Sequence, residues 1–333
     1  MFRPRQVLAM LKFFANRWVC LLVFAPGVAA FLASCSQPAK KAGEGDPGAP
    51  AGGSGKLQVT TTVNIVSDLV RQVGGDHVEV TEIMGPGVDP HLYKASANDV
   101  TKLQNAEIIF YVGLLLEGKM EEVLGKLKDG GKPVYAVTQD LQKTKLLDSG
   151  EYEDHFDPHV WFEVPLWKET IDVVVAGLSK ADSDHKADYE ANGNAAKEKM
   201  EDLQTWATEK VNELPVEKRL LVTSHDAYNY FGRAYGFKVV GLQGISTVSE
   251  AGLADRTKLV DFIKEQKVKS IFVETTVNPD AIKAIATDAE VTIGGELFSD
   301  AMGELGQMDG GLDLGTYEGM IKHNISTIVN ALR

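Results

Sequence analysis

The residues of this 333-residue chain that could support chemistry are chiefly its seven histidines, two of which each end an Asp-Pro-His tripeptide. Asp89-Pro90-His91 and Asp157-Pro158-His159 each lie beside apolar, strand-like sequence. Because proline fixes its own backbone φ angle, each tripeptide would hold its histidine in a defined position. The repeat therefore indicates two prepositioned imidazole ligands.

Two further candidate ligands follow strand-like runs in the second half of the chain. His225 comes directly after the run 220–223, and Asp300 follows a β-prone run at 291–293 and a predicted loop at 295–299. In parallel α/β sheets, ligands bind beyond the carboxyl ends of the strands. These loops could therefore meet at one cleft.

The set His91, His159, His225 and Asp300 supplies three nitrogens and one carboxylate. Neutral imidazole and carboxylate oxygen suit a divalent transition metal, and one carboxylate offsets part of its charge. Glu274 ends another strand-like run and could accept an N–H from a ligand histidine, with a purely structural role as the alternative.

The elements that must position these residues alternate along the first half of the chain. A helical run covers 65–73, and Ser96 with Asp99 forms a capping-box pair before a helix that starts at Ala97. The strand-like runs are 57–63, 78–83 and 106–112. Such alternation predicts a parallel sheet flanked by helices.

A second α/β block follows a long polar helix. The second block has strand-like runs at 220–223, 237–240 and 270–273. The helix carries a narrow apolar stripe of Tyr189, Ala196, Met200, Leu203, Ala207, Val211 and Leu214. Its length favours a strut between two lobes, whereas Gly193 slightly favours an ordinary surface helix. We expect an α/β fold of two small parallel-sheet lobes, 57–184 and 215–333, joined by one helix at 185–214, with ligand loops that could converge on a cleft.

The N-terminal segment does not belong to this fold. Residues 1–34 contain basic residues without acids and a short apolar run, the pattern of an export signal. Leu32-Ala33-Ser34-Cys35 resembles a bacterial lipobox, whose cysteine is lipidated. Residues 35–56 are rich in Gly, Ala, Pro and Lys and predict a flexible tether. An uncleaved anchor is the alternative, and both interpretations place the protein outside the cytoplasmic membrane.

The overall charge of the chain argues against one class of binding partner. The formal net charge is −13, from 34 Lys+Arg against 47 Asp+Glu. Phosphate binding needs basic surface, so we expect no nucleic-acid partner. An acidic exterior suits a protein that handles cations.

At its ligand motifs the chain resembles the solute-binding lipoproteins of zinc/manganese ABC importers, cluster A-I. The matching motifs are Asp89-Pro90-His91-Leu92-Tyr93, Asp157-Pro158-His159-Val160-Trp161, Ser224-His225 before Tyr230-Phe231, and Ser299-Asp300. The resemblance extends from about Gln58 to the C-terminus.

The resemblance implies one buried metal, bound by His91 and His159 from the first lobe and His225 and Asp300 from the second. It also implies limited lobe motion and delivery of the ion to a membrane permease driven by a cytoplasmic ATPase. We expect a monomer attached to a bacterial membrane, in the periplasm or at the cell surface, through lipid on Cys35.

The sequence leaves the identity of the metal open between Zn²⁺ and Mn²⁺. Nitrogen-rich sites bind zinc more tightly than manganese, so His225, where some relatives have glutamate, tilts the choice toward zinc. The segment 148–157 is short and acidic, without the histidine-rich loop of zinc-specialised relatives, which weakens a zinc-only interpretation.

Two other functions stay open at this point. Three histidines could support a metal-dependent hydrolase, although four protein ligands would leave tetrahedral zinc no vacancy for water, so we expect no enzyme. A surface adhesion lipoprotein with an incidental metal is the other alternative. His77, His185 and His323 lie in polar or helical surroundings, and we exclude them from the site.

Overall fold

The computed structural model describes residues 55–150 and 155–333. The predicted signal peptide 1–34, Cys35 and nearly all of the tether 35–56 lie outside the described residues. Within the described part of the chain, no helix is both long and apolar enough to cross a bilayer.

The first lobe is built on a four-stranded parallel sheet of order β2-β1-β3-β4. Its strands are β1 (Leu57–Val63), β2 (Val78–Met84), β3 (Ile108–Tyr111) and β4 (Val134–Ala136). The residues of β1 are almost all buried, because helices cover both faces of the sheet. The strand-like runs 57–63, 78–83 and 106–112 therefore form β1, β2 and β3 of a parallel sheet, as predicted, with β2 at the edge.

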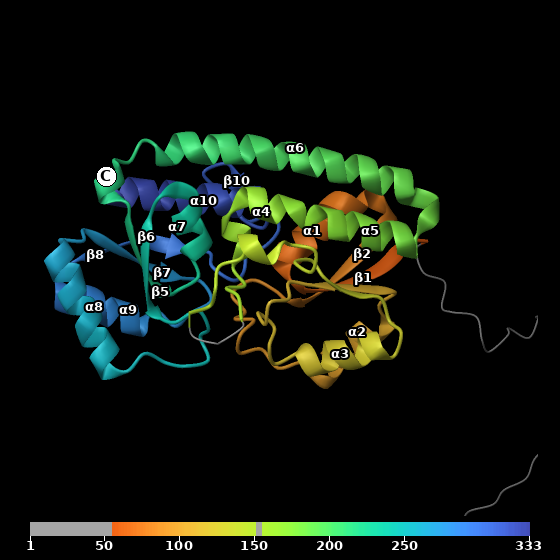
Figure 1. The fold of residues 1–333 in the computed structure, drawn as a ribbon, viewed down its shortest axis with the longest axis horizontal. Helices are drawn as coiled ribbons and strands as arrows, with labels where there is room; N and C mark the ends of the chain where they lie inside the picture. Colours follow the sequence, from red (N-terminus) through yellow and green to blue (C-terminus); the bar gives the residue numbers. More distant parts are fainter. Residues whose placement is uncertain (1–54, 151–154) are drawn as a thin grey trace, which may run out of the picture. The chain divides into compact units, whose positions relative to one another are not determined.

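The helices of this lobe divide between the two faces of the sheet (Figure 1). They are α1 (Asn64–Gly74), α2 (Ala97–Asn105), α3 (Glu121–Asp129), α4 (Val164–Glu169) and α5 (Ile171–Ala181). Helix α2 starts at Ala97 with a complete capping box, in which Ser96 Oγ accepts from Asp99 N at 3.2 Å. The capping-box prediction is confirmed.

The second lobe has four parallel-running strands in two hydrogen-bonded pairs, β5-β6 and β7-β8, with β5 and β7 adjacent. The strands are β5 (Leu220–His225), β6 (Lys238–Gln243), β7 (Ser270–Glu274) and β8 (Thr292–Leu297). The helices are α7 (Asn229–Tyr235), α8 (Leu253–Gln266), α9 (Asp280–Ala289) and α10 (Tyr317–Leu332), and a small hairpin, β9 (Met308–Asp309) and β10 (Leu312–Asp313), precedes α10. The two lobes repeat the same layered α/β plan.

Two strands of this lobe are longer than predicted. Strand β8 continues through Gly295, which the sequence placed in a loop, because β8 follows β7 past an irregularity at Ile271 and Phe272. A side chain at Gly295 would meet Thr327 of α10 at 2.4 Å, so the glycine lets helix and strand approach closely. Strand β5 likewise ends at His225 itself.

Helix α6 (Lys186–Val211) has 26 residues and packs on elements of both lobes, α1, α4 and α5 of the first and α10 of the second (Figure 1). It buries six residues of its predicted stripe, Tyr189, Ala196, Met200, Leu203, Ala207 and Val211, together with Gly193. The seventh, Leu214, is also buried but lies beyond the end of the helix. A Cβ on Gly193 would lie 2.5 Å from Val175 Cγ2 of α5. Gly193 therefore marks close helix packing, and the interpretation of it as a sign of a simple surface helix was wrong.

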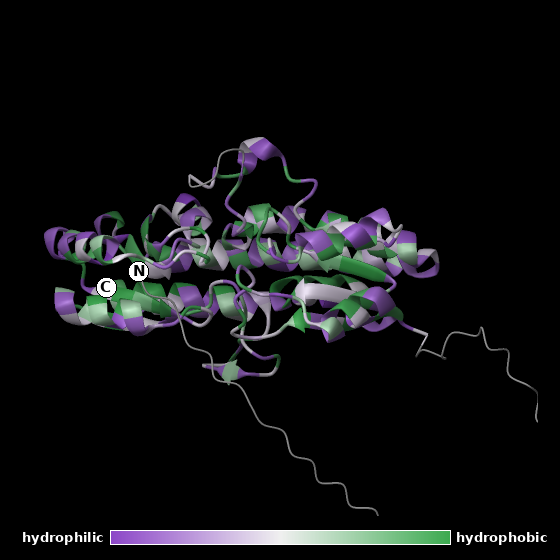
Figure 2. Ribbon diagram, turned by 90° about the horizontal axis from the view of Figure 1, so that it is seen from below, coloured by the Kyte–Doolittle hydropathy of each residue, from purple (hydrophilic) through white to green (hydrophobic). Residues whose placement is uncertain are grey.

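One hydrophobic core extends from the first lobe under α6 to α7 and α10, and a smaller core lies beneath α8 and α9. Figure 2 shows the helices carrying both hydrophilic and hydrophobic residues, as expected for amphipathic helices packed against a core. The long helix and the shared core thus fix the frame on which the ligand loops sit.

Candidate metal centre

The four predicted ligand residues lie together, each offering one ligand atom within 4.8 Å of the others. His91 lies in the loop after β2, and His159 directly precedes the short helix η3 (Val160–Phe162). His225 ends β5, and Asp300 follows β8. All four are buried, with His91 the most exposed at 5%.

The ligand atoms are close but poorly matched to one another as hydrogen-bond partners. His91 Nε2 lies 3.4 Å from His159 Nε2, and Asp300 oxygens lie 3.2 Å from His159 Nε2 and 3.4 Å from His225 Nε2. His225 Nε2 and Asp300 Oδ1 are buried without a hydrogen-bond partner among the described residues. Buried polar atoms normally have partners. A cation held between them would satisfy these atoms, so the donor set fits a divalent metal.

Asp157 sets the orientation of the His159 ring. Asp157 Oδ1 lies 2.7 Å from His159 Nδ1 and accepts the backbone N–H of His159 at 2.9 Å. In the neutral ring, with Nδ1–H donated to the carboxylate, Nε2 would carry the lone pair that faces the centre. This role of Asp157 was not predicted from sequence, although a carboxylate two residues before the histidine was a usable signal.

Glu274 contacts His225 in the same way from a neighbouring strand. Its Oε2 lies 2.5 Å from His225 Nδ1, and its Oε1 accepts the backbone N–H of His225 at 2.8 Å. The carboxylate is 1% exposed. Glu274, which the sequence suggested as a hydrogen-bond partner of a ligand histidine, thus contacts one of the four predicted ligands, His225.

Asp89 does something different from Asp157, although the tripeptides are identical. Its Oδ1 accepts the backbone N–H of His91 at 2.8 Å, as Asp157 does for His159. Its Oδ2 accepts a hydrogen bond from Thr247 Oγ1 of the second lobe at 2.6 Å. The first tripeptide therefore also ties the two lobes together beside the centre.

The carboxylates control the protonation of the centre. Burial alone would raise the pKa of Asp300, but the His225 and His159 rings outweigh it and hold that pKa well below its usual range. Burial likewise opposes charge on His159, but Asp157 and Asp300 raise its pKa to about 9. The pKa of His91 is lowered to about 3, chiefly by burial. The site thus has one firmly ionised carboxylate and one imidazole ready to bind without losing a proton.

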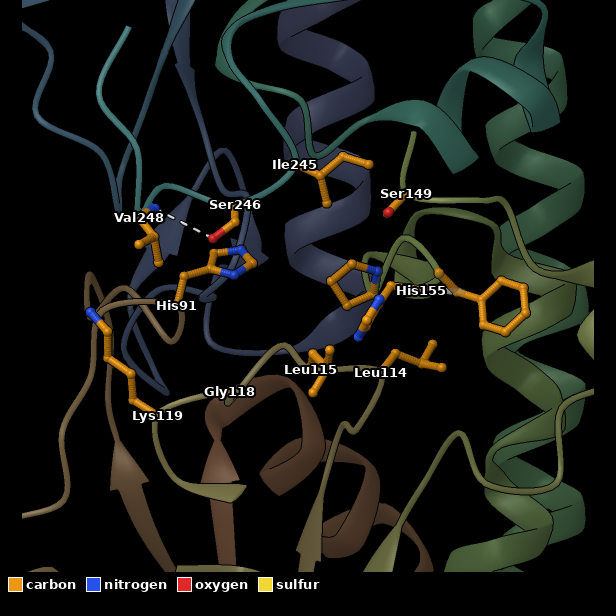
Figure 3. Close-up of a pocket in the computed structure, with 12 residues that line it drawn as sticks. His91, Leu114, Leu115, Gly118, Lys119, Ser149, His155, Ile245, Ser246 and Val248 are labelled. Carbon is orange, nitrogen blue, oxygen red and sulfur yellow. Dashed lines mark hydrogen bonds between the residues drawn. The ribbon is translucent and has the colours of Figure 1, made fainter. Parts of the chain in front are cut away.

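A cavity of about 250 Å³ leads from the surface to His91 (Figure 3). Figure 3 shows Leu114 and Leu115 on one side and Ile245 and Val248 on the other, so the opening lies between loops of both lobes. Leu114 and Leu115 have φ angles of 54° and 66°. Such backbone is costly for leucine and persists only where the surroundings enforce it.

The buried carboxylate of Glu117 enforces this loop conformation. It accepts hydrogen bonds from Val112 N at 2.8 Å and Gly113 N at 3.2 Å, and from Thr62 Oγ1 at 2.6 Å. These bonds tie the loop to β1, so the apolar wall of the opening is a fixed feature.

The three histidines that the sequence led us to exclude from the site lie outside the four-ligand cluster. His77 stacks on His185 with ring centroids 3.9 Å apart, and His323 Nε2 lies 3.1 Å from the Glu296 carbonyl oxygen. His155, from the acidic segment 148–157, lines the opening, and residues 151–154 of that segment lie outside the described part.

The sequence matches a known protein family and several characterised members of it. Residues 59–331 match the family model described as "Zinc-uptake complex component A periplasmic". The manganese-binding lipoprotein MntA of Bacillus subtilis (strain 168) is 47% identical over 283 residues, which cover 84% of this chain and 90% of that protein. The zinc-binding protein TroA of Treponema pallidum (strain Nichols) is 43% identical over 287 residues, 85% of this chain and 91% of that protein.

The solved structure of the periplasmic zinc-binding protein TroA from Treponema pallidum superposes with a TM-score of 0.78 at 43% identity. It covers 84% of this chain and 99% of that one. The expected fold class of two parallel-sheet lobes and a long helix is confirmed.

Proposed function

The chain belongs to the zinc-uptake complex component A family of periplasmic metal-binding proteins, and from this premise we propose that it captures one Zn²⁺ or Mn²⁺ ion outside the cytoplasmic membrane and delivers it to an ABC importer. The observation that carries the proposal is the convergence of four buried donors from distant segments on one point. His91, His159, His225 and Asp300 are the proposed ligands.

The proposed roles of the neighbouring carboxylates follow from their contacts. Asp157 and Glu274 each touch the Nδ1 of a ligand histidine, so that both Nε2 atoms face the ion. Partners of this kind fix the tautomer of a ligand imidazole and raise its basicity. Glu274 is therefore proposed to position His225, and Asp157 to position His159.

The choice between the two metals rests on the donor set. Three imidazole nitrogens favour Zn²⁺ over Mn²⁺ on affinity. One relative is named manganese-binding and the other zinc-binding, so the names support either ion. The proposed cargo is accordingly a divalent transition metal of this pair, with the ratio of the two affinities as the quantity to measure.

The proposed membrane attachment concerns the segment before the fold. Several relatives are named lipoproteins of metal ABC transporters. We propose that residues 1–34 are a signal peptide, that Cys35 carries lipid, and that 35–56 tether a monomer of lobes 57–184 and 215–333 joined by 185–214. Mass spectrometry of the mature N-terminus tests this, because a Cys35→Ala variant should lose the lipid and leave the membrane fraction.

Binding without turnover is the proposed activity. With four protein ligands, a tetrahedral zinc would keep no position for the water that a hydrolytic site needs. Family membership also favours transport over hydrolysis and over adhesion with an incidental metal.

The decisive experiment is elemental analysis of the purified protein combined with competitive titration of Zn²⁺ and Mn²⁺. We expect one ion per chain and tight binding of at least one of the two metals. Binding of neither metal, or hydrolysis of test esters and phosphates that depends on His159, would overturn the proposal.

A further inference from the structure

A second cavity, of about 400 Å³, lies beyond the carboxyl ends of β5, β6 and β7 of the second lobe, and Asp89 and Leu92 of the first lobe also line it. The adjacent strands run in the order β6-β5-β7-β8, so the chain passes from β5 to β6 on one side and then crosses from β6 to β7 on the other side of β5. Such a crossover point of an open parallel sheet is where α/β proteins bind small ligands. The volume falls in the range of small-molecule sites.

Three polar side-chain atoms of residues that line this cavity are buried and lack hydrogen-bond partners among the described residues. They are Ser224 Oγ, Gln243 Oε1 and Arg256 Nε. Ser224 is 2% exposed. Leaving a buried donor or acceptor unpaired costs free energy, so three in one cavity need an explanation. A bound molecule that pairs with them supplies it.

Of Ser224, Gln243 and Arg256, only the Arg256 side chain carries a positive charge. No ion pair joins its guanidinium to an acid in the part of the chain that the structure describes, although the chain is strongly acidic. An arginine that lines a cavity without a carboxylate partner is suited to a carboxylate ligand, which it can bind through two parallel N–H groups.

The acids that line the cavity narrow the ligand further. Asp89, Glu250 and Asp280 line it together with Arg256, which gives three acidic residues to one basic residue. A simple anion or a polyanion such as phosphate would be repelled by the acids, and a bare metal cation would be repelled by the guanidinium. A molecule that carries both charges meets neither repulsion.

We propose that this cavity binds a small zwitterion of the amino-acid type. The carboxylate pairs with Arg256 and accepts a hydrogen bond from the Ser224 hydroxyl. The ammonium group donates to Gln243 Oε1 and faces the acidic side of the cavity. The proposal goes beyond metal delivery, because none of these three residues belongs to the four-donor cluster.

Calorimetric titration of the full mature chain tests the proposal. The probes are L-alanine and L-glutamine as zwitterions, propionate as the carboxylate alone, ethylammonium as the amine alone, and inorganic phosphate. The titrations use metal-free protein, so that chelation of a bound ion cannot produce the heat. We expect at least one amino acid to bind, and the single-charge probes to bind much more weakly.

Arg256→Met keeps an unbranched apolar stem and removes the charged guanidinium, and we expect it to weaken amino-acid binding at least about thirtyfold. Lys258→Met is the matched control on the same helix, because the Lys258 side chain is 79% exposed and pairs with Asp255 at 3.5 Å. It should bind like the unmodified protein. If Arg256→Met fails to fold, Ser224→Ala provides the same test with almost no change in volume.

Several results would overturn the proposal. The proposal fails if neither amino acid binds, if propionate or phosphate binds as tightly as the amino acids, or if binding survives in a folded Arg256→Met protein. Because these titrations contain no metal, their failure leaves the proposed metal function untouched, and failure of metal binding leaves this cavity untouched.

Discussion

Glu274 holds His225 at two atoms, with 2.5 Å from its Oε2 to the ring Nδ1 and 2.8 Å from its Oε1 to the backbone nitrogen. The two residues lie at the ends of adjacent strands, β7 and β5. A carboxylate in this position orients the ring and strengthens its other nitrogen as a ligand.

Glu274→Gln should therefore lower metal affinity by about 10–100-fold, the range typical for partners of ligand histidines. Competition with a chromogenic chelator measures it. Glu296→Gln is the control, because Glu296 is an exposed residue on the neighbouring strand β8. Thermal unfolding of the metal-free proteins separates a metal effect from a folding effect. Equal affinities for the two variants would argue against a positioning role.

Replacing a ligand should cost more than replacing its partner. His159→Ala removes a donor that lies within reach of His91 and Asp300, so its loss should exceed the roughly 10–100-fold expected for a positioning residue. His185→Ala removes a half-buried histidine that pairs with Asp182, outside the four-donor cluster, and should leave affinity unchanged. Equilibrium titration with Zn²⁺ gives the comparison, and similar losses would remove the reason for choosing His159.

Metal affinity should rise with pH over a wider range than an ordinary imidazole would give. The pKa of His159 is raised to about 9, so the metal-free protein keeps a proton on this ring below that pH, and the cation must displace it. Affinity should fall by about one log unit per pH unit for each displaced proton. An imidazole with an ordinary pKa of about 6.5 would weaken binding only below that pH.

Titrations in buffers of different ionisation enthalpy count the released protons directly. His185→Ala should show the same pH profile as the unmodified protein. An affinity that does not change between about pH 6 and about pH 9 would contradict this assignment of the proton.

The hydrogen bond from Thr247 to Asp89 should slow release of the ion. It joins the two lobes at 2.6 Å beside the centre. Thr247→Val removes a bond worth about 1 kcal/mol, so we expect roughly fivefold faster metal release. Stopped-flow mixing with excess chelator measures the rate, and Thr257→Val on exposed helix surface is the control. An unchanged rate would mean that the ion leaves without parting these two residues.

Two glycines inside helices should respond in opposite ways to alanine. In α3, a Cβ on Gly125 would meet nothing within 4 Å, so Gly125→Ala should stabilise the protein by about 0.5–1 kcal/mol. In α6, a Cβ on Gly193 would lie 2.5 Å from the branched side chain of Val175, so Gly193→Ala should destabilise it by about 1–3 kcal/mol. Denaturant unfolding compares the two. Stabilisation by both would show that α6 can move away from α5.

The layered fold could be predicted because its signals are local. The strand β1, the capping box at Ser96 and the buried stripe of α6 each depend on residues close together in sequence. The end of β8 could not be predicted, because Gly295 joins the strand through pairing with β7 and contact with α10. Gly193 was misinterpreted for the same reason, because its role depends on close packing against Val175 of another helix, α5.

The sequence by itself determined which side chains could bind a metal, because two Asp-Pro-His tripeptides and two residues after strands carry that chemistry in their composition. Only the tertiary structure decided that the four side chains meet at one point and that Asp157 turns a ring while Asp89 joins the lobes. It alone also decided that Arg256 faces a cavity without a carboxylate partner in the described chain. The physical reason is that composition and short-range spacing fix chemistry and local backbone, whereas burial, pairing and charge balance arise only when distant segments pack together.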